Sequence, residues 1–202
     1  MVLSRVERWS RLRGGVARGR RRGLALLAAA GAAVGVVTVL AGCAGVDPQV
    51  YARETPALDL RQWFDGTLEG HGMFTDRSGA VKRRFVVSIK ATWAGDTGTL
   101  DEDFTWSDGE RQQRVWTLRR QADGSWQGTA PDVVGTARGV IAGNALNWRY
   151  VLALKTPERT WNLDFDVWMF LNDDRVMLNR ASMSLWGFDA GEVLISFRRV
   201  GR

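Results

Sequence analysis

The sequence predicts an all-β protein, a single antiparallel up-and-down barrel of about eight to ten strands. Turn signals recur at nearly regular intervals from Thr67 onward, and the runs between them are rich in β-forming residues that often alternate between apolar and polar. No segment after residue 65 has a convincing 3.6-residue period. A long meander must protect its edge strands, and closure into a barrel removes those edges. A two-sheet β-sandwich is the alternative, but it needs long crossover connections, and few connections here are long enough.

The N-terminal part of the chain has the composition of an export signal. Residues 1–22 contain eight Arg and one Glu, residues 24–40 carry no charge, and residues 40–43 read Leu-Ala-Gly-Cys. This order is typical of a secretory signal peptide, and its end resembles the bacterial lipobox, whose Cys is linked to diacylglycerol. We therefore predict a lipoprotein signal peptide over residues 1–42 and lipid attachment at Cys43. A plain transmembrane anchor is the alternative, but the 17 apolar residues fall short of the roughly 20 that span a bilayer.

The positive charge of the chain is concentrated in this signal. The whole chain has a net charge of +6 and residues 1–22 carry +7, so the remainder carries −1. A basic protein often binds nucleic acid, but here the basic segment is the part that export removes, and we expect no nucleic-acid partner. Because Cys43 is the only cysteine, its lipidation leaves no thiol for a disulfide or a metal site.

The residue after the lipidated Cys indicates where the protein is delivered. Lipoproteins that stay in the inner membrane usually carry Asp at this position, and this chain has Ala44. We expect a Gram-negative outer-membrane protein on the periplasmic face, with the membrane as its partner through the acyl anchor. Protein partners are not indicated by the sequence.

The mature chain divides into a tether and one barrel domain. Residues 43–57 contain two prolines and no apolar period, which is typical of a tether, and residues 58–202 form the domain. Leu58 to Phe64 can form one short helical turn with Asp59 as its N-cap. Asp, Asn and Gly clusters supply the backbone conformations that tight hairpins need. Turns are predicted at residues 76–79, 95–98, 107–109, 122–124, 142–144, 156–158, 172–174 and 189–191.

Residues suited to catalysis are sparse. His71 is the only histidine, and a single His without a second His or a Cys does not make a typical transition-metal site. The chain has no Gly-x-Ser-x-Gly nucleophile motif and no phosphate-binding glycine loop. Residues 101–103, Asp-Glu-Asp, are the densest acidic cluster, but a strand divides them between its two faces, and a solvated strand is the favoured interpretation. We predict no catalytic residue, no metal and no cofactor, and therefore no enzyme.

Polar side chains at alternating positions on three consecutive predicted strands are the best candidates for a ligand pocket. If their face is outside, they are ordinary surface residues. If it is inside, the charges must pair, and a network of Arg149 with two aspartates could hold a ligand headgroup. Most tryptophans also lie on predicted strands, where they can fill the core, line a pocket or face the membrane. The candidate pocket residues are Asn147, Arg149, Asp164, Asp166, Trp168 and Asn179.

Motifs on these strands resemble a known family. They include Asp101-Glu102-Asp103-Phe104, Arg114-x-Trp116, Asp132-Val133-Val134-Gly135 and Asn147-Trp148-Arg149-Tyr150. Over about residues 50–199 the chain resembles an uncharacterised family of Gram-negative lipoproteins, domain of unknown function 3833. The resemblance implies a small, periplasmic, lipocalin-like β-barrel and carries no activity. This chain departs from the family at two positions: Val167 stands where an acid tends to precede Trp-Met, and the basic residue near Leu185 is missing.

Three functions remain open on the sequence. The first is a lipocalin-like barrel, tethered to the outer membrane, that binds or shuttles a lipid or another hydrophobic small molecule. The second is a non-enzymatic structural or assembly factor of the envelope whose barrel is filled with tryptophan. The third is an enzyme that acts through Arg149 and the two aspartates. A cavity would favour the first over the second, and a raised carboxylate pKa in a cleft would favour the third.

Replacing Cys43 tests the predicted anchor. Cys43→Ser removes the thiol that receives the lipid, so we expect an uncleaved precursor or a soluble species in place of a membrane-bound protein. Membrane fractionation and labelling with palmitate measure both properties. A variant that still labels and still fractionates with the outer membrane would show that the lipobox interpretation is wrong.

Overall fold

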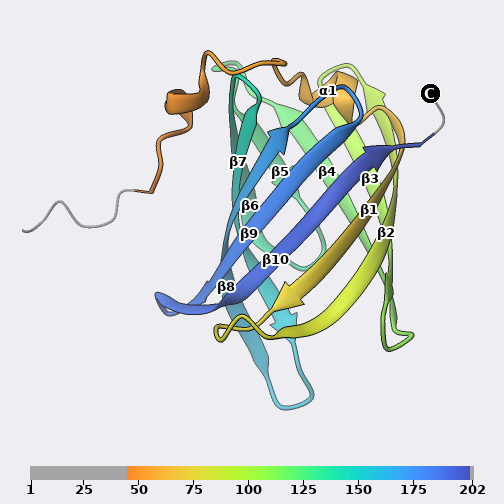
Figure 1. Ribbon diagram of the computed structural model, residues 1–202, viewed down its shortest axis with the longest axis vertical. Coiled ribbons are helices and arrows are strands. Elements are labelled where there is room, and N and C mark those ends of the chain that lie inside the picture. The colour runs from red at the N-terminus through yellow and green to blue at the C-terminus, as the bar shows by residue number, and fades with distance from the viewer. Residues whose placement is uncertain (1–44, 201–202) are drawn as a thin grey trace, which may run out of the picture. The chain divides into compact units, whose positions relative to one another are not determined.

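Ten antiparallel strands form one closed barrel in the computed structural model, which describes residues 45–200 (Figure 1). The predicted fold class is therefore confirmed, and the chain does not form the alternative sandwich. The predicted signal peptide and Cys43 lie outside the described residues. The strands are β1 (Gly66–Thr75), β2 (Val81–Ala94), β3 (Thr97–Trp106), β4 (Arg111–Arg120), β5 (Trp126–Thr129), β6 (Val133–Ala142), β7 (Ala145–Lys155), β8 (Thr160–Leu171), β9 (Val176–Leu185) and β10 (Phe188–Arg199).

Each strand pairs with its neighbours in sequence, and the pairing of β1 with β10 closes the ring. Along this closure Gly70 pairs with Phe197 and Thr75 pairs with Glu192. The whole barrel comes from residues 66–199, which lie within one compact unit that begins at Gly45. This unit therefore contains every strand pairing that closes the barrel and is expected to fold without the residues that precede it.

Most hairpin turns lie where the sequence predicts them, and the last one does not. Residues 189–191 form a bulge inside β10, where the register with β9 shifts, and Trp186 and Gly187 make the turn instead. Their φ values are 54° and 81°, and the Trp186 side chain is exposed. The break at residues 130–132 between β5 and β6 was not predicted either, although this segment contains Pro131 and Asp132.

Strand alternation assigns one apolar row of each long strand to the interior. The inner row of β2 runs from Phe85 to Ala91, and its four members are at most 5% exposed. The Trp148 ring lies directly against the backbone of two neighbouring strands, because Gly128 and Gly139 have no side chain there. A Cβ at these positions would come within 2.5 and 2.3 Å of the ring. Large rings thus pack flat against the wall of the barrel.

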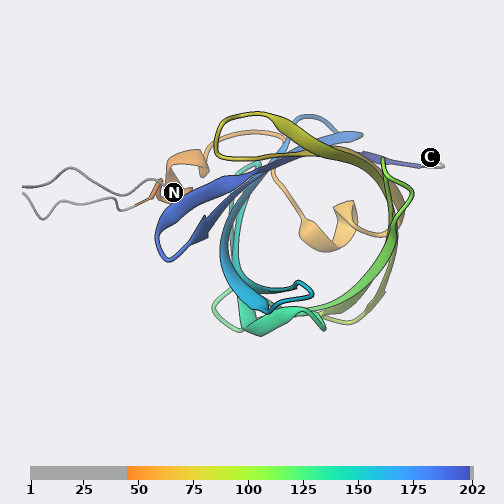
Figure 2. The ribbon, with the colours of Figure 1, turned by 90° about the horizontal axis from the view of Figure 1, so that it is seen from below.

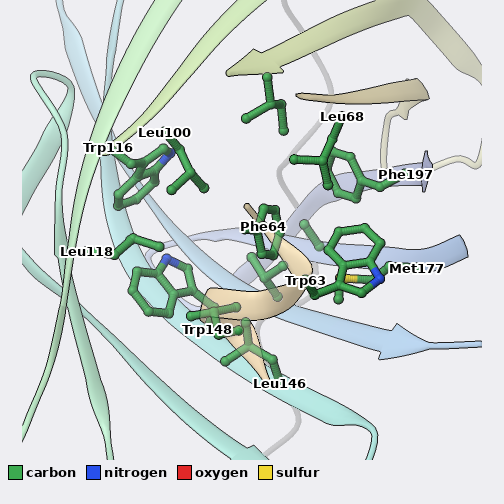
Figure 3. Packing of buried hydrophobic residues seen from close by; sticks show 14 of the residues in the cluster. Trp63, Phe64, Leu68, Leu100, Trp116, Leu118, Leu146, Trp148, Met177 and Phe197 are labelled. Atoms are coloured by element: carbon green, nitrogen blue, oxygen red, sulfur yellow. The ribbon is translucent and has the colours of Figure 1, made fainter. Parts of the chain in front are cut away.

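One helical turn closes an end of the barrel. α1 (Leu60–Trp63) begins after Asp59, whose carboxylate accepts a hydrogen bond from the N–H of Gln62 at 3.0 Å, as expected of an N-cap. Trp63 and the following Phe64 are each only 4% exposed. Figure 2 shows α1 within the ring of strands, and Figure 3 shows Phe64 among side chains from opposite walls. The short helix therefore acts as an apolar plug.

The predicted tether lies partly against the outside of the barrel. It contains a short 3-10 helix, η1 (Pro48–Tyr51), which contacts β6 and β7. The Tyr51 ring meets Trp168 and Phe170 edge-on, with centroids 5.6 and 5.1 Å apart. Further along, the N–H of Leu58 donates to the carbonyl of Gly143 at 2.8 Å. The described part of the tether is thus ordered by contacts with the domain.

Candidate functional site: the interior cavity

The barrel encloses a cavity of about 800 Å³. α1 lines one end through Leu60 and Phe64, and residues near the opposite strand ends, among them Arg83 and Lys155, line the other end, which we call the mouth. The volume lies within the roughly 300–1,000 Å³ that is usual for small-molecule pockets. Most of the lining is apolar and includes Phe85, Ile89, Leu100, Trp116, Phe165 and Met183.

Four residues form a polar wall on one side of this cavity: Glu102, Arg114, Asp132 and Tyr150. Glu102 on β3 and Arg114 on β4 are direct cross-strand partners. Nε of Arg114 donates to both carboxylate oxygens of Asp132 at 3.1 and 3.0 Å, and Nη2 donates to Oδ2 at 2.7 Å. Tyr150 on β7 stacks on Phe165 with ring centroids 4.8 Å apart. Burial raises the pKa of the Tyr150 phenol, which therefore stays neutral.

The carboxyl group of Glu102 is neutral more often than an ordinary glutamate. Its pKa is raised to about 7, chiefly because burial among protein atoms disfavours the charged form. The carboxylates of Asp132 and Asp101 raise it further, whereas Arg114 and a hydrogen bond from Trp116 lower it. Near pH 7 the polar wall therefore carries a carboxyl group that can either donate or accept a hydrogen bond.

A second group of charges lies at the mouth. Nη2 of Arg83 donates to Asp108 at 2.8 Å and to Glu110 at 2.7 Å, and its guanidinium lies 4.1 Å from the centroid of the Trp106 ring. Lys155 is exposed at the end of β7. Both guanidinium groups that line the cavity, those of Arg83 and Arg114, are thus already paired with carboxylates.

Asn179 is the one candidate pocket residue of the sequence that lines the cavity. It lies on the inner row of β9 between Met177 and Ala181 and is 6% exposed. Within the part of the chain that the structure describes, no side chain or backbone group donates a hydrogen bond to its Oδ1. A buried amide without a partner is costly. Asn179 therefore offers hydrogen bonding to a molecule in the cavity.

The other five candidates lie on the outer faces of β7 and β8. Arg149 and Asp166 form an ion pair, Nε to Oδ1 at 3.2 Å, and their side chains are 53% and 41% exposed. Asn147 also reaches Asp166, because its Nδ2 donates to Oδ1 at 2.6 Å. Asp164 is exposed. These charges face away from the cavity, because the inner row of β7 contains Trp148 and its alternating neighbours.

This outer polar group adjoins the N-terminal segment. Trp168 contacts Tyr51 of η1, and the backbone of Gly45 lies so close to Arg149 that a Cβ there would be 3.1 Å from Nη2. The structure thus brings Asn147, Arg149, Asp166 and Trp168 together on the outside and separates them from Asn179. Their observed contacts are with the start of the domain.

The remaining polar features of the sequence lie on the surface. His71 is exposed on β1 and bonds to Glu69 at 2.9 Å. It borders a second, more open hollow of about 840 Å³ along β1, β2, β9 and β10, whose lining also includes Asn179, and Arg180 beside it pairs with Glu192. Between residues 45 and 200, no group of three or more His, Cys, Asp or Glu side chains is placed to hold a metal ion. In the same range no helix is both long and apolar enough to cross a membrane.

The polar wall was not predicted from the sequence, although alternation marks its members. Glu102 points to the same face of its strand as Leu100 and Phe104, and Arg114 points to the same face as Trp116. Each of the two therefore belongs to an otherwise apolar row. The acidic neighbours of Glu102 instead suggested a solvated strand. A polar residue within an apolar row was the signal that could have identified this wall.

The fold and the cavity define the class of this protein: a single-domain, up-and-down β-barrel that encloses a mainly apolar cavity with one polar wall. The chain belongs to the family described as "Protein of unknown function (DUF3833)", whose model matches residues 37–199. The resemblance seen in the sequence motifs is therefore confirmed. No curated protein matches the chain.

Several solved barrels are similar to this one in fold. An S-type phycobiliprotein lyase from Guillardia theta has a TM-score of 0.52 at 5% identity, and the match covers 78% of this chain and 100% of the lyase. A de novo designed fluorescence-activating β-barrel has a TM-score of 0.40 at 12% identity, over 70% of this chain and 98% of the design. Lobster apocrustacyanin A1 has a TM-score of 0.36 at 13% identity, over 79% and 72%. At such identities the likeness concerns the fold alone.

Breaking the inner ion pair should destabilise the domain more than breaking the outer one. Arg114→Met leaves Asp132 without its partner at a side chain that is only 25% exposed, so we expect a loss of about 2–3 kcal/mol in the free energy of unfolding. The control is Arg149→Met, which breaks a half-exposed pair and should cost less than about 1 kcal/mol. Urea denaturation of residues 45–202 measures both losses, and equal losses would contradict the inner placement.

The raised pKa of Glu102 should make the stability of the domain depend on pH. This pKa is 4.5 in the unfolded chain and about 7 in the folded one, so the folded state holds the proton more tightly. Glu102 is protonated in both states well below pH 4.5, and its stabilising effect is lost as the pH rises to about 7. The free energy of unfolding should fall by at most about 3 kcal/mol over this range, because each unit of pKa difference between the two states contributes about 1.4 kcal/mol.

Glu102→Gln cannot titrate and should therefore gain stability relative to the wild type between pH 4 and pH 8. Thermal melts across this range measure the difference. Asp103→Asn, on the exposed face of the same strand, is the control. A difference between wild type and Glu102→Gln that does not change with pH would contradict the burial of this carboxyl group.

Proposed function

We propose that this protein is a lipid-anchored barrel of the Gram-negative cell envelope that binds one hydrophobic small molecule in its interior. The enclosed cavity of about 800 Å³ is the observation that carries this proposal. An apolar lining with a few polar groups on one side is typical of small-molecule sites. The lining supplies affinity by removing apolar ligand surface from water, and the polar wall supplies orientation.

The packing of the tryptophans supports a binding protein over an assembly factor with a filled barrel. Trp116 and Trp148 meet edge to face with centroids 5.8 Å apart, and Trp148 lies flat against Gly128 and Gly139. These rings therefore form part of the cavity wall and leave the space in front of them open. A structural role alone would not require such a space.

The anchored location is proposed from the sequence motif that ends at Cys43 and from Ala44 after it. The first described residue, Gly45, lies beside Arg149 on the outside of β7 and not at the mouth of the cavity.

An enzymatic role is the second candidate, and Glu102 favours it. A carboxyl group with a pKa of about 7 beside a phenol and a guanidinium is suited to acid–base chemistry at neutral pH. The similar fold of a phycobiliprotein lyase is compatible with this role. Native mass spectrometry of the ligand that co-purifies separates the two functions. A carrier returns its ligand unchanged after incubation, whereas an enzyme converts it.

Narrowing the cavity should weaken binding. Ala181 is buried on the inner row of β9 and lines the cavity, so Ala181→Phe places a ring in the space of the ligand. We expect the affinity of residues 45–202 for the fluorescent apolar probe N-phenyl-1-naphthylamine to fall about tenfold or more. The matched control is Ser182→Phe, which adds the same ring on the outer face of the same strand.

Circular dichroism establishes that both variants are folded. If Ala181→Phe binds the probe as tightly as the wild type, the probe occupies another place and the proposal is wrong. If Val193→Phe, which also lines the cavity from β10, likewise leaves binding unchanged, the same conclusion holds independently of position 181.

A further inference from the structure

The positive charges that line the cavity are occupied, apart from one at its mouth. Arg114 makes three hydrogen bonds to Asp132 and faces Glu102 across the strand pair. Arg83 is held by two carboxylates. Lys155 is exposed to water, where its field is screened. A ligand acid that entered the cavity would therefore find no unpaired cation beyond the mouth among the described residues.

The same arrangement opposes a buried anion. Moving a carboxylate or phosphate out of water costs several kcal/mol unless a cation and hydrogen bonds replace the lost hydration. The polar wall instead presents the Arg114–Asp132 pair, which is neutral as a whole, and the carboxyl group of Glu102, which repels an anionic group when it is ionised. A neutral polar group has a much smaller desolvation cost, so the wall discriminates by charge.

Three cavity-lining residues have a buried polar atom without a hydrogen-bond partner within residues 45–200: Oδ1 of Asn179, Nε1 of Trp106 and Nε of Arg83. The charge of Arg83 is already balanced by Asp108 and Glu110 at the mouth, whereas Asn179 and Trp106 are neutral groups. Asn179 is more than nine-tenths buried. A hydroxyl group can donate to an amide oxygen or accept from an N–H, whereas an ionised carboxylate can only accept.

We infer that the ligand is a neutral hydrophobic alcohol, an apolar body that carries a hydroxyl group and no acid, with the hydroxyl bound at Asn179. This inference rests on the proposed function, because it requires the cavity to be the binding site. It narrows the ligand from hydrophobic molecules in general to one class. An acid group is disfavoured inside the cavity by its charge, and a plain hydrocarbon leaves Asn179 unpaired.

Three probes of equal chain length test the inference on residues 45–202: dodecane, dodecan-1-ol and dodecanoate. Displacement of N-phenyl-1-naphthylamine at pH 8 measures the affinity of each, with dodecane and dodecan-1-ol kept below their solubility limits and dodecanoate below its critical micelle concentration. We expect dodecan-1-ol to bind about tenfold more tightly than dodecanoate and severalfold more tightly than dodecane. The difference in affinity between dodecan-1-ol and dodecane measures the effect of the hydrogen bond. The difference between dodecan-1-ol and dodecanoate measures the effect of the charge.

Two substitutions test which residues cause these differences in affinity. Asn179→Leu keeps the volume of the side chain and removes the amide, so dodecan-1-ol should lose its advantage over dodecane. Asp132→Asn releases Arg114 and should shift the preference toward dodecanoate. The matched control is Asp164→Asn, which changes the net charge equally on the outer face and should leave the preference unchanged.

The outcomes distinguish this inference from the proposed function. If dodecane and dodecanoate both displace the probe and dodecanoate equals or exceeds dodecan-1-ol, the cavity binds ligands and the inference is overturned. If none of the three displaces the probe, the proposed function fails and the inference fails with it. The comparison of the three probes on the wild-type domain decides this even if a variant does not fold.

Discussion

The pairing of β1 with β10 is the contact on which the rest of the structure depends. It turns a linear meander into a ring, so that every long strand acquires an inside and an outside. Two glycines on β1 permit this closure to pack tightly. A Cβ at Gly70 would come within 2.8 Å of the Phe197 ring, and one at Gly72 within 2.3 Å of the Phe85 ring. Side chains of the neighbouring strands therefore cover the closing strand from within.

Closure also surrounds the polar wall with apolar side chains. Charged groups inside a ring of apolar side chains are stable only if they are paired or neutralised. Arg114 and Asp132 are paired through three hydrogen bonds. Burial raises the pKa of both Tyr150 and Glu102, so Tyr150 stays neutral and Glu102 is partly neutral near pH 7. Among the described residues the interior thus keeps hydrogen-bonding groups without a free cation beyond the mouth, and this balance is the basis for the inferred neutral ligand.

The outside of the barrel has a different role. The polar residues of β7 and β8 lie beside the segment that leads into the domain, where Tyr51 packs against Trp168 and Gly45 lies beside Arg149. The lateral segment and the plug α1 follow one another in sequence, so residues 45–64 connect the side of the barrel to its closed end. In the proposed protein this arrangement leaves the mouth available for exchange of a ligand.

The sequence by itself determined the properties that depend on neighbouring residues. Period-two alternation located the strands, Asp and Gly clusters located most turns, and Asp59 marked the start of α1. The tertiary structure decided which polar residues face the cavity, because parity along a strand says only that two residues share a face. The apolar row around Glu102 hints at an inner position, but closure of the barrel and its packing determine that Glu102 lines the cavity and that Arg149 lies outside. Whether a residue is buried depends on the packing of the whole barrel and cannot be read from a single strand.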